Sequence, residues 1–201
     1  MNESSPFTVA AALSTRPARR AHISFSAEIN PMTTDGLISL LARLVNDGFN
    51  DVHLLISTAG GSVMNGVNLY SLLRALPIHL TTHNVGNVDS IGNAIFLAGQ
   101  ERYACPHSTF SFHGVGLDIA QRCRLEEAKI REHLNSILNE QRRIGSIIRE
   151  RTRLSEQQIR KLFRETQAKE AEWAKRVGIV HDVRNATIAP GAPIHALAFP
   201  H

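Results

Sequence analysis

The sequence is poor in cysteine, in aromatic residues and in long apolar runs, and each shortage excludes a class of protein. Two cysteines in 201 residues are too few for a disulfide framework, which favours a reduced, intracellular protein. Aromatic residues make up only 5% of the chain, so few side chains could stack on single-stranded nucleic acid. No apolar run approaches the roughly 18–20 residues that cross a bilayer. Because residues 1–20 also lack the features of a signal peptide, we expect a cytoplasmic protein with no membrane partner.

The remaining composition is ordinary for a globular domain, with 43% hydrophobic and 20% charged residues. The formal net charge is +4, but the basic residues of the second half alternate with glutamates such as Glu132, Glu140 and Glu150. Such mixing is typical of a solvated helix face, so we expect no nucleic-acid partner. The ten histidines show no close spacing of the kind that binds zinc. We therefore predict neither a metal nor a cofactor.

Apolar periodicity predicts an α/β domain, because strand-like and helix-like segments alternate along the first half of the chain. The expected strands lie at 21–29, 51–57 and 78–85, with one or two short strands within 101–115. The expected helices lie at 35–47, 62–76 and 90–99. This order implies right-handed crossovers between parallel strands.

The second half of the chain is predicted to be helical. One long helix is expected over 126–152, and Ser155 with Gln158 forms a capping box that opens the next helix. A last helix is expected over 169–180. The Ala/Pro-rich end, 185–201, is predicted to be a mobile tail. With a loose N-terminal arm at 1–21, this leaves one domain at 22–184.

The first candidate for chemistry is the glycine pair in TAGGSV, which lies between an expected strand and an expected helix. Gly60 and Gly61 allow a sharp turn that exposes backbone N–H groups, and such donors stabilise a phosphate or a tetrahedral oxyanion. A plain tight turn explains the pair equally well.

The second and third candidates are Ser90, in GNVDSIGNA, and His113, in TFSFHGV. An acyl-transfer nucleophile protrudes at a tight turn, with the next N–H free to bind the oxyanion. Ser90 fits this description, but Ser90 or Asp89 could also simply cap a helix. His113 ends an apolar strand, where a histidine is either structural or a general base within reach of the serine.

Taken in order, GGSV, S-I-G, F-H-G and the long helix resemble the proteolytic subunit of the Clp proteases, over about residues 22–183. The corresponding motifs of that family read PGGSV, AASMG and MIHQP. The resemblance implies the ClpP/crotonase fold, with repeated β-β-α units and a protruding handle helix at about 120–151. It also implies that Ser90 is the nucleophile and His113 the general base, and that Gly61 and Ile91 supply the oxyanion-hole N–H groups.

Three positions depart from the family pattern. Ala59 replaces a proline, and Asp89 replaces a small residue before the nucleophile, where its charge would oppose a developing oxyanion. Counting back from Gly178, the third member of the triad falls on Thr166, and Glu165 is the nearest carboxylate. A threonine can orient an imidazole but cannot stabilise the imidazolium with charge. We therefore expect slow catalysis, with Glu165 as the alternative third member.

The function that the resemblance implies is a serine endopeptidase that hydrolyses peptides or unfolded proteins inside an oligomeric chamber. The resembled family assembles as two stacked heptameric rings and works with an AAA+ ATPase unfoldase, and this sequence has no nucleotide-binding loop of its own. Three alternatives remain: a catalytically weak or inactive Clp-like scaffold subunit, a crotonase-type acyl-CoA enzyme, and a Ser–Lys peptidase that uses Lys129 or Lys169.

Overall fold

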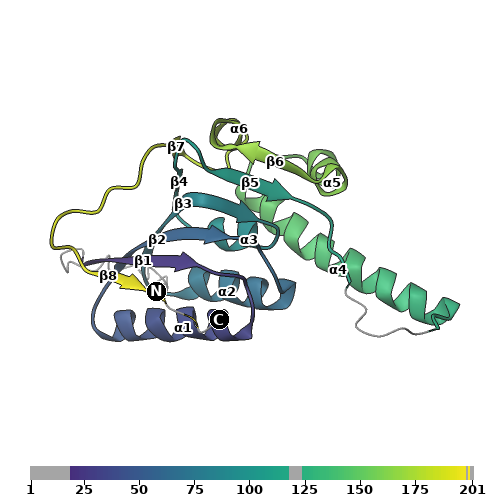
Figure 1. Cartoon of the computed structure of the whole chain (residues 1–201), viewed down its shortest axis with the longest axis horizontal. Coiled ribbons are helices and arrows are strands. Elements are labelled where there is room, and N and C mark those ends of the chain that lie inside the picture. Colours follow the sequence, from purple (N-terminus) through teal and green to yellow (C-terminus); the bar gives the residue numbers. More distant parts are fainter. Residues whose placement is uncertain (1–18, 118–123, 198, 200–201) are drawn as a thin grey trace, which may run out of the picture.

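Short apolar segments form the strands of one mixed sheet, and the amphipathic segments between them form helices (Figure 1). The computed structural model describes residues 19–117, 124–197 and 199. The strands are β1 (Arg20–Ser26), β2 (Asp51–Thr58), β3 (His79–Asp89), β4 (Glu101–Ala104), β5 (Thr109–Phe112), β6 (Gln167–Glu170), β7 (Asp182–Val183) and β8 (Ile194–Ala196). The helices are α1 (Pro31–Asn46), α2 (Val63–Ala75), α3 (Gly92–Phe96), α4 (Glu127–Arg151), α5 (Glu156–Glu165) and α6 (Ala171–Arg176).

The long strand β3 is the branch point of the sheet. The main path runs β6-β5-β3-β2-β1-β8, and β4 and β7 branch off it. The first half of β3 pairs with β4 and the second half with β5, both in parallel. Only the β5–β6 pair is antiparallel among the described strands. The carboxyl ends of β2, β3 and β5 therefore face the same way, which is where α/β proteins commonly place their sites.

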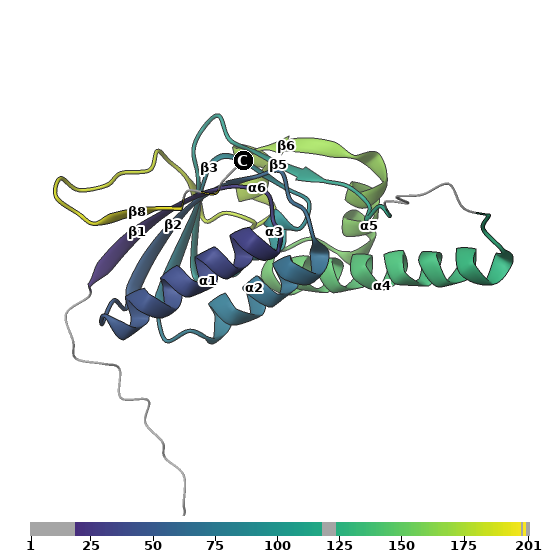
Figure 2. The ribbon, with the colours of Figure 1, turned by 60° about the horizontal axis from the view of Figure 1, so that its bottom comes forward.

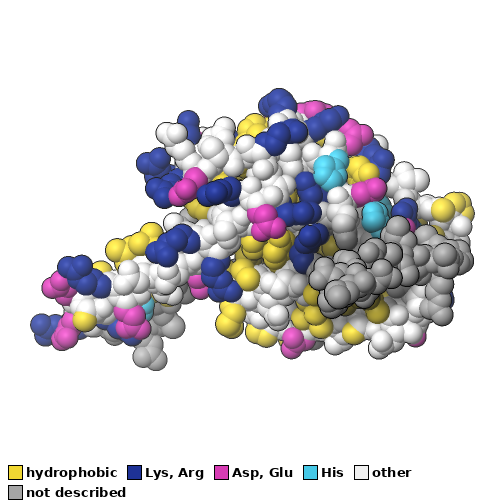
Figure 3. Space-filling view, turned by 180° about the vertical axis from the view of Figure 1, so that it is seen from behind, with side chains coloured by type: hydrophobic (Ala, Val, Ile, Leu, Met, Phe, Trp, Pro, Cys, Tyr) yellow, Lys and Arg dark blue, Asp and Glu magenta, His cyan; other side chains and the backbone are white. Residues whose placement is uncertain are grey.

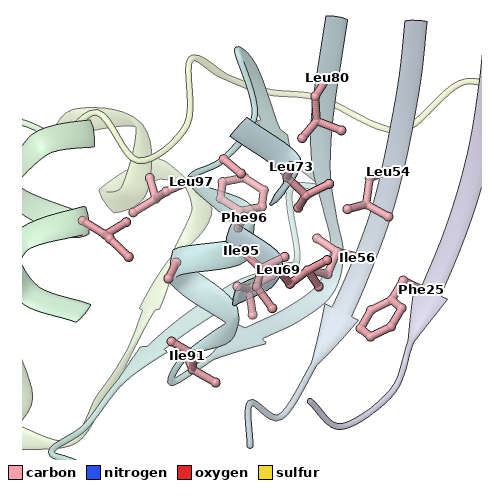
Figure 4. Close-up of a cluster of buried hydrophobic side chains, with 14 of the residues drawn as sticks. Phe25, Leu54, Ile56, Leu69, Leu73, Leu80, Ile91, Ile95, Phe96 and Leu97 are labelled. Carbon is pink, nitrogen blue, oxygen red and sulfur yellow. The ribbon is translucent and has the colours of Figure 1, made fainter. Parts of the chain in front are cut away.

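The hydrophobic core lies between the sheet and the helices (Figure 4). Strand β2 is buried along nearly its whole length, as expected for a parallel strand covered on both faces. Helices α1 and α2 lie side by side below the sheet in Figure 1. Among the largest fully buried side chains are Phe25, Phe96 and Phe110. This packing fixes the strand ends and α3 relative to one another.

Helix α4 extends well beyond the rest of the domain (Figure 2). Its only buried residues are Ile144, Ile147 and Ile148, near its C-terminal end. Closer to its N-terminus, Ile130, Leu134 and Leu138 are 51%, 52% and 41% exposed. Figure 3 shows hydrophobic side chains along this projecting arm. The predicted handle helix is thus present over Glu127–Arg151, and residues 120–123 of the prediction lie outside the described residues.

Two predicted segments were wrong. Residues 169–170, expected to open the last helix, belong to strand β6, which pairs with β5, and the helix begins only at Ala171. The predicted mobile tail contains strand β8, which pairs with β1 in parallel. The capping box of Ser155 and Gln158 is confirmed. Most of the predicted N-terminal arm, residues 1–18, lies outside the described residues.

Within the described part of the chain, none of the helices has the length and apolar character needed to cross a membrane.

Candidate active site

Ser90 lies in a strained turn between the end of β3 and the start of α3. Its φ is +54°, a left-handed conformation that residues other than glycine rarely adopt. The turn is held on both sides: the Ser90 N–H donates to the Ser111 carbonyl at 3.0 Å, and the Ser90 carbonyl accepts from the Asn93 N–H at 3.1 Å. Strained conformations of this kind cluster at functional sites, and a serine on a sharp strand-to-helix turn presents its hydroxyl outward.

The glycine pair after β2 packs directly against Ser90. Gly60 and Gly61 have φ values of +91° and +140°. A methyl group on Gly60 would lie 2.6 Å from the Cβ of Ser90, so only glycine fits this position. The pair is fixed from its other side, because the Ile29 N–H donates to the Gly60 carbonyl at 2.7 Å. The structure thus brings these two predicted motifs together.

Two backbone N–H groups near Ser90 are available as hydrogen-bond donors. Among the hydrogen bonds of the described residues, neither the Gly61 N–H nor the Ile91 N–H is a donor. The Ile91 side chain is fully buried, and it packs so closely on Gly66 of α2 that a methyl group there would lie 2.2 Å from its Cγ1. The backbone at Ile91 is therefore held by the core (Figure 4). These are the two donors that the sequence predicted for an oxyanion.

His113 follows β5, the strand next to β3. Asp89 pairs with Ser111 across these strands, so His113 lies two residues beyond the partner of Asp89. Its Nδ1 is 2.8 Å from the Gly114 carbonyl oxygen. A carbonyl can only accept, so Nδ1 carries the proton in this assignment, and the neutral ring keeps Nε2 as its lone-pair nitrogen. That tautomer is the one a general base at Nε2 requires.

The predicted third member, Thr166, lies near the end of the β5–β6 pair. Strand β6 pairs with β5 so that Phe112 faces Gln167, and His113 and Thr166 each lie one residue beyond this last pair. Thr166 ends α5 in a left-handed conformation, with a φ of +45°. Among the described residues, however, no hydrogen bond joins His113 to Thr166 or Glu165, because Nδ1 is directed at Gly114. The Glu165 carboxylate lies 3.6 Å from the Lys161 ammonium instead.

Two asparagines near Ser90 were not predicted from the sequence. The Asn87 amide donates a hydrogen bond of 2.6 Å to the Asp89 carboxylate. The negative charge of Asp89 is therefore hydrogen-bonded beside the turn. Asn93 is 1% exposed and donates to the Ser90 and Ser111 carbonyls. A signal for Asn93 was available, because it is the only polar side chain in the apolar run IGNAIFLAG. In the part of the chain that the structure describes, no group of three or more His, Cys, Asp or Glu side chains is arranged to hold a metal ion.

A family model described as Clp protease matches residues 8–187. The chain belongs to the Clp protease family. Among curated Clp relatives, an ATP-dependent Clp protease proteolytic subunit 2 from Chlamydia trachomatis and one from Chlamydia muridarum are each 29% identical over 119 residues. Each alignment covers 55% of this chain and 58% of the relative, so the chain matches little more than half the length of these relatives.

A solved Clp structure, a ClpP1 mutant from Listeria monocytogenes, matches with a TM-score of 0.73. The match covers 82% of this chain and 91% of that chain at 22% identity, and it shows the ClpP fold. The predicted family and fold class are thereby confirmed.

Proposed function

We propose that this Clp-family chain is a serine peptidase whose nucleophile is Ser90. The observation that carries the proposal is the strained Ser90 turn, which packs on Gly60 and ends the strand next to the one that carries His113. Among the described residues, the N–H groups of Gly61 and Ile91 near this turn donate no hydrogen bond. The names of the Chlamydia relatives support the same reaction class.

In the proposed mechanism, His113 Nε2 removes the hydroxyl proton of Ser90 as Oγ attacks the carbonyl carbon of a peptide bond. The Gly61 and Ile91 N–H groups stabilise the negative oxygen of the tetrahedral intermediate. The intermediate collapses when the imidazolium returns its proton to the leaving amine, which gives an acyl-enzyme. His113 then activates a water, which hydrolyses the ester and restores the Ser90 hydroxyl.

The reaction is expected to be slow. Replacing the triad carboxylate costs on the order of 10⁴ in rate in a serine protease, and here the Nδ1 proton faces a neutral carbonyl. Thr166→Asp should raise turnover, because a carboxylate opposite His113 would stabilise the imidazolium, whereas Glu165→Ala should change little. Loss of activity in Glu165→Ala, with Thr166→Ala fully active, would show that Glu165 is the third member.

The direct test is labelling with a fluorophosphonate probe, together with hydrolysis of fluorogenic peptides and esters. Wild type and the exposed-serine control Ser71→Ala should label at one serine and hydrolyse substrate, while Ser90→Ala should do neither. If wild type and Ser90→Ala are equally inert towards the probe and every substrate, the peptidase proposal fails. The alternative, a catalytically inactive scaffold subunit, then takes its place. The threonine at the third triad position, where the family has a carboxylate, supports that alternative.

We also propose that the subunit assembles through helix α4. A helix of 25 residues is about 37 Å long at 1.5 Å per residue, and the exposed stripe of Ile130, Leu134 and Leu138 lies beyond its packed end. A second copy that covers this stripe would join two rings, and an AAA+ ATPase would deliver unfolded substrate in the cytoplasm.

In light scattering, wild type should be an oligomer. Leu134→Asp should reduce its size and the control Ser136→Asp should not, and a monomeric wild type at micromolar concentration would refute the assembly.

A further inference from the structure

Asn93 is a buried polar residue within the short helix that follows Ser90. It is 1% exposed and its neighbours Gly92 and Ala94 are equally buried. Its side-chain Nδ2 donates to the Ser90 carbonyl at 3.0 Å and to the Ser111 carbonyl at 2.9 Å. Both acceptors are carbonyl oxygens, which fixes the orientation of the amide, because the flipped group would place Oδ1 against two acceptors.

These two hydrogen bonds link the two halves of the proposed site. Ser90 follows β3, and Ser111 lies on β5, two residues before His113. The Ser111 carbonyl also accepts the Ser90 N–H at 3.0 Å, so its two lone pairs bind the nucleophile's own peptide and the Asn93 amide. One side chain therefore holds the strained serine and the strand that carries the histidine.

Burying the Asn93 side chain has a free-energy cost that its packing alone does not explain. Asn93 Oδ1 is buried without a hydrogen-bond partner in the described residues. An unsatisfied buried acceptor is rare in folded proteins and calls for an explanation. An alanine would fill this short helix without that cost, but it could not join the two carbonyls.

We infer that Asn93 is a positioning residue for Ser90, which it holds in the left-handed turn at a fixed distance from the His113 strand. The inference rests on the proposed function, because it assigns Asn93 to the same reaction. Asn93 touches neither substrate nor reacting atom. Its effect should appear in the rate of attack by Ser90 and not in substrate affinity.

The chain offers a matched control at the other end of α3. The Thr82 hydroxyl is fully buried and donates to the Phe96 carbonyl at 2.8 Å. Thr82→Val removes a buried hydrogen bond to the same helix without touching the Ser90 turn. A purely structural role for Asn93 predicts that Asn93→Ala and Thr82→Val behave alike.

The first readout compares the rate at which a fluorophosphonate phosphonylates Ser90, followed by intact mass, with kcat and KM on a fluorogenic peptide. In Asn93→Ala, Ser90 should be phosphonylated and peptide turned over on the order of 10- to 100-fold more slowly than in wild type, the scale on which a misplaced catalytic group slows a reaction. The KM of Asn93→Ala should stay close to that of wild type. In Thr82→Val, Ser90 should be phosphonylated at the wild-type rate, even if the melting temperature falls as far as it does in Asn93→Ala.

The second readout is the pH profile of Asn93→Asp relative to wild type. Near pH 8 the carboxylate would face two carbonyl oxygens and the variant should be as slow as Asn93→Ala. Burial raises the pKa of a carboxyl, and once protonated the group can donate one hydrogen bond. The activity ratio of variant to wild type should therefore recover as the pH falls towards about 5.5.

Equal phosphonylation rates for wild type and Asn93→Ala, or equal slowing in Asn93→Ala and Thr82→Val, would overturn the inference and leave the proposed function standing. A flat Asn93→Asp ratio across the pH range would also overturn it. Wild type that never labels at Ser90 would overturn the proposed function, and the inference with it.

Discussion

Three buried histidines form a row across the sheet, and we expect this row to make the folded protein sensitive to mild acid. His22, His53 and His83 come from β1, β2 and β3, with successive ring centroids 5.4 Å apart. His83 Nε2–H donates to the Arg184 carbonyl at 2.9 Å, so its Nδ1 accepts from His53 Nε2–H at 3.3 Å. A proton added at His83 Nδ1 would set one donor against another.

The size of the expected loss in the free energy of unfolding follows from the pKa of His53. Burial, followed by the neighbouring His83, His22 and Arg20, lowers this pKa from 6.5 to about 4, and Asp51 opposes the shift only weakly. Burial also lowers the pKa of His83. Below pH 6.5 the unfolded chain binds more protons than the folded one, so stability is full above this pH and falls towards pH 4. For His53 the loss is about 3 kcal/mol in total and about 2 kcal/mol by pH 5.

The assay is urea unfolding followed by far-UV circular dichroism at about pH 7 and pH 5, at one protein concentration because assembly shifts apparent stability. His53→Phe keeps a flat ring but cannot titrate. Wild type should lose about 2 kcal/mol more than His53→Phe between the two pH values. The hydrogen bond from Lys175 lowers the pKa of Asp182, so this carboxylate stays ionised across the window. Equal losses in the two proteins would show that His53 does not cause the sensitivity to acid.

Three further substitutions test the packing of the core and of the site. Arg102 is 6% exposed and donates to carbonyls of Gly99, Arg151, Gly178 and Ile179. Arg102→Met should therefore lower the free energy of unfolding by about 2–4 kcal/mol; a loss below half of that in urea unfolding would contradict this. Gly60→Ala should abolish fluorophosphonate labelling of Ser90 while circular dichroism stays native, because the added methyl group meets the Ser90 Cβ at 2.6 Å; normal labelling would contradict the site geometry. Gly66→Ala should lower both the melting temperature and labelling by displacing Ile91, and an unchanged melting temperature would show that α2 moves freely.

The alternation of strands and helices could be predicted, because elements that bury one face show it as an apolar periodicity in the sequence. Several boundaries of these elements could not be predicted. The strand predicted to end at Val85 continues to Asp89, because its second half pairs with β5. Gly86 and Asn87 are typical of a turn, and the pairing overrides that local preference. The same applies to β6. Its sequence QAKE favours a helix, but the segment forms a strand because it pairs with β5.

The residues of the candidate site could be predicted from the order of their motifs in the sequence, but their contacts could be predicted only in part. The contact of Gly60 with Ser90 agrees with that order. The hydrogen bond of His113 to Gly114 could not be predicted, because it depends on a rotamer and not on a spacing. Asn93 was missed for a similar reason, since its two acceptors lie on segments that meet only in the folded protein.

A crystal structure of the protein after reaction with a fluorophosphonate would show directly whether Ser90 attacks and whether the Gly61 and Ile91 N–H groups bind the oxyanion. Phosphorus should be bonded to Ser90 Oγ, with a phosphoryl oxygen within about 3.1 Å of both backbone nitrogens. His113 Nε2 should lie within hydrogen-bond reach of the adduct. A Ser90 hydroxyl that stays unmodified, or that lies more than about 6 Å from both His113 ring nitrogens, beyond hydrogen-bond reach even for an unliganded site, would contradict the proposed mechanism.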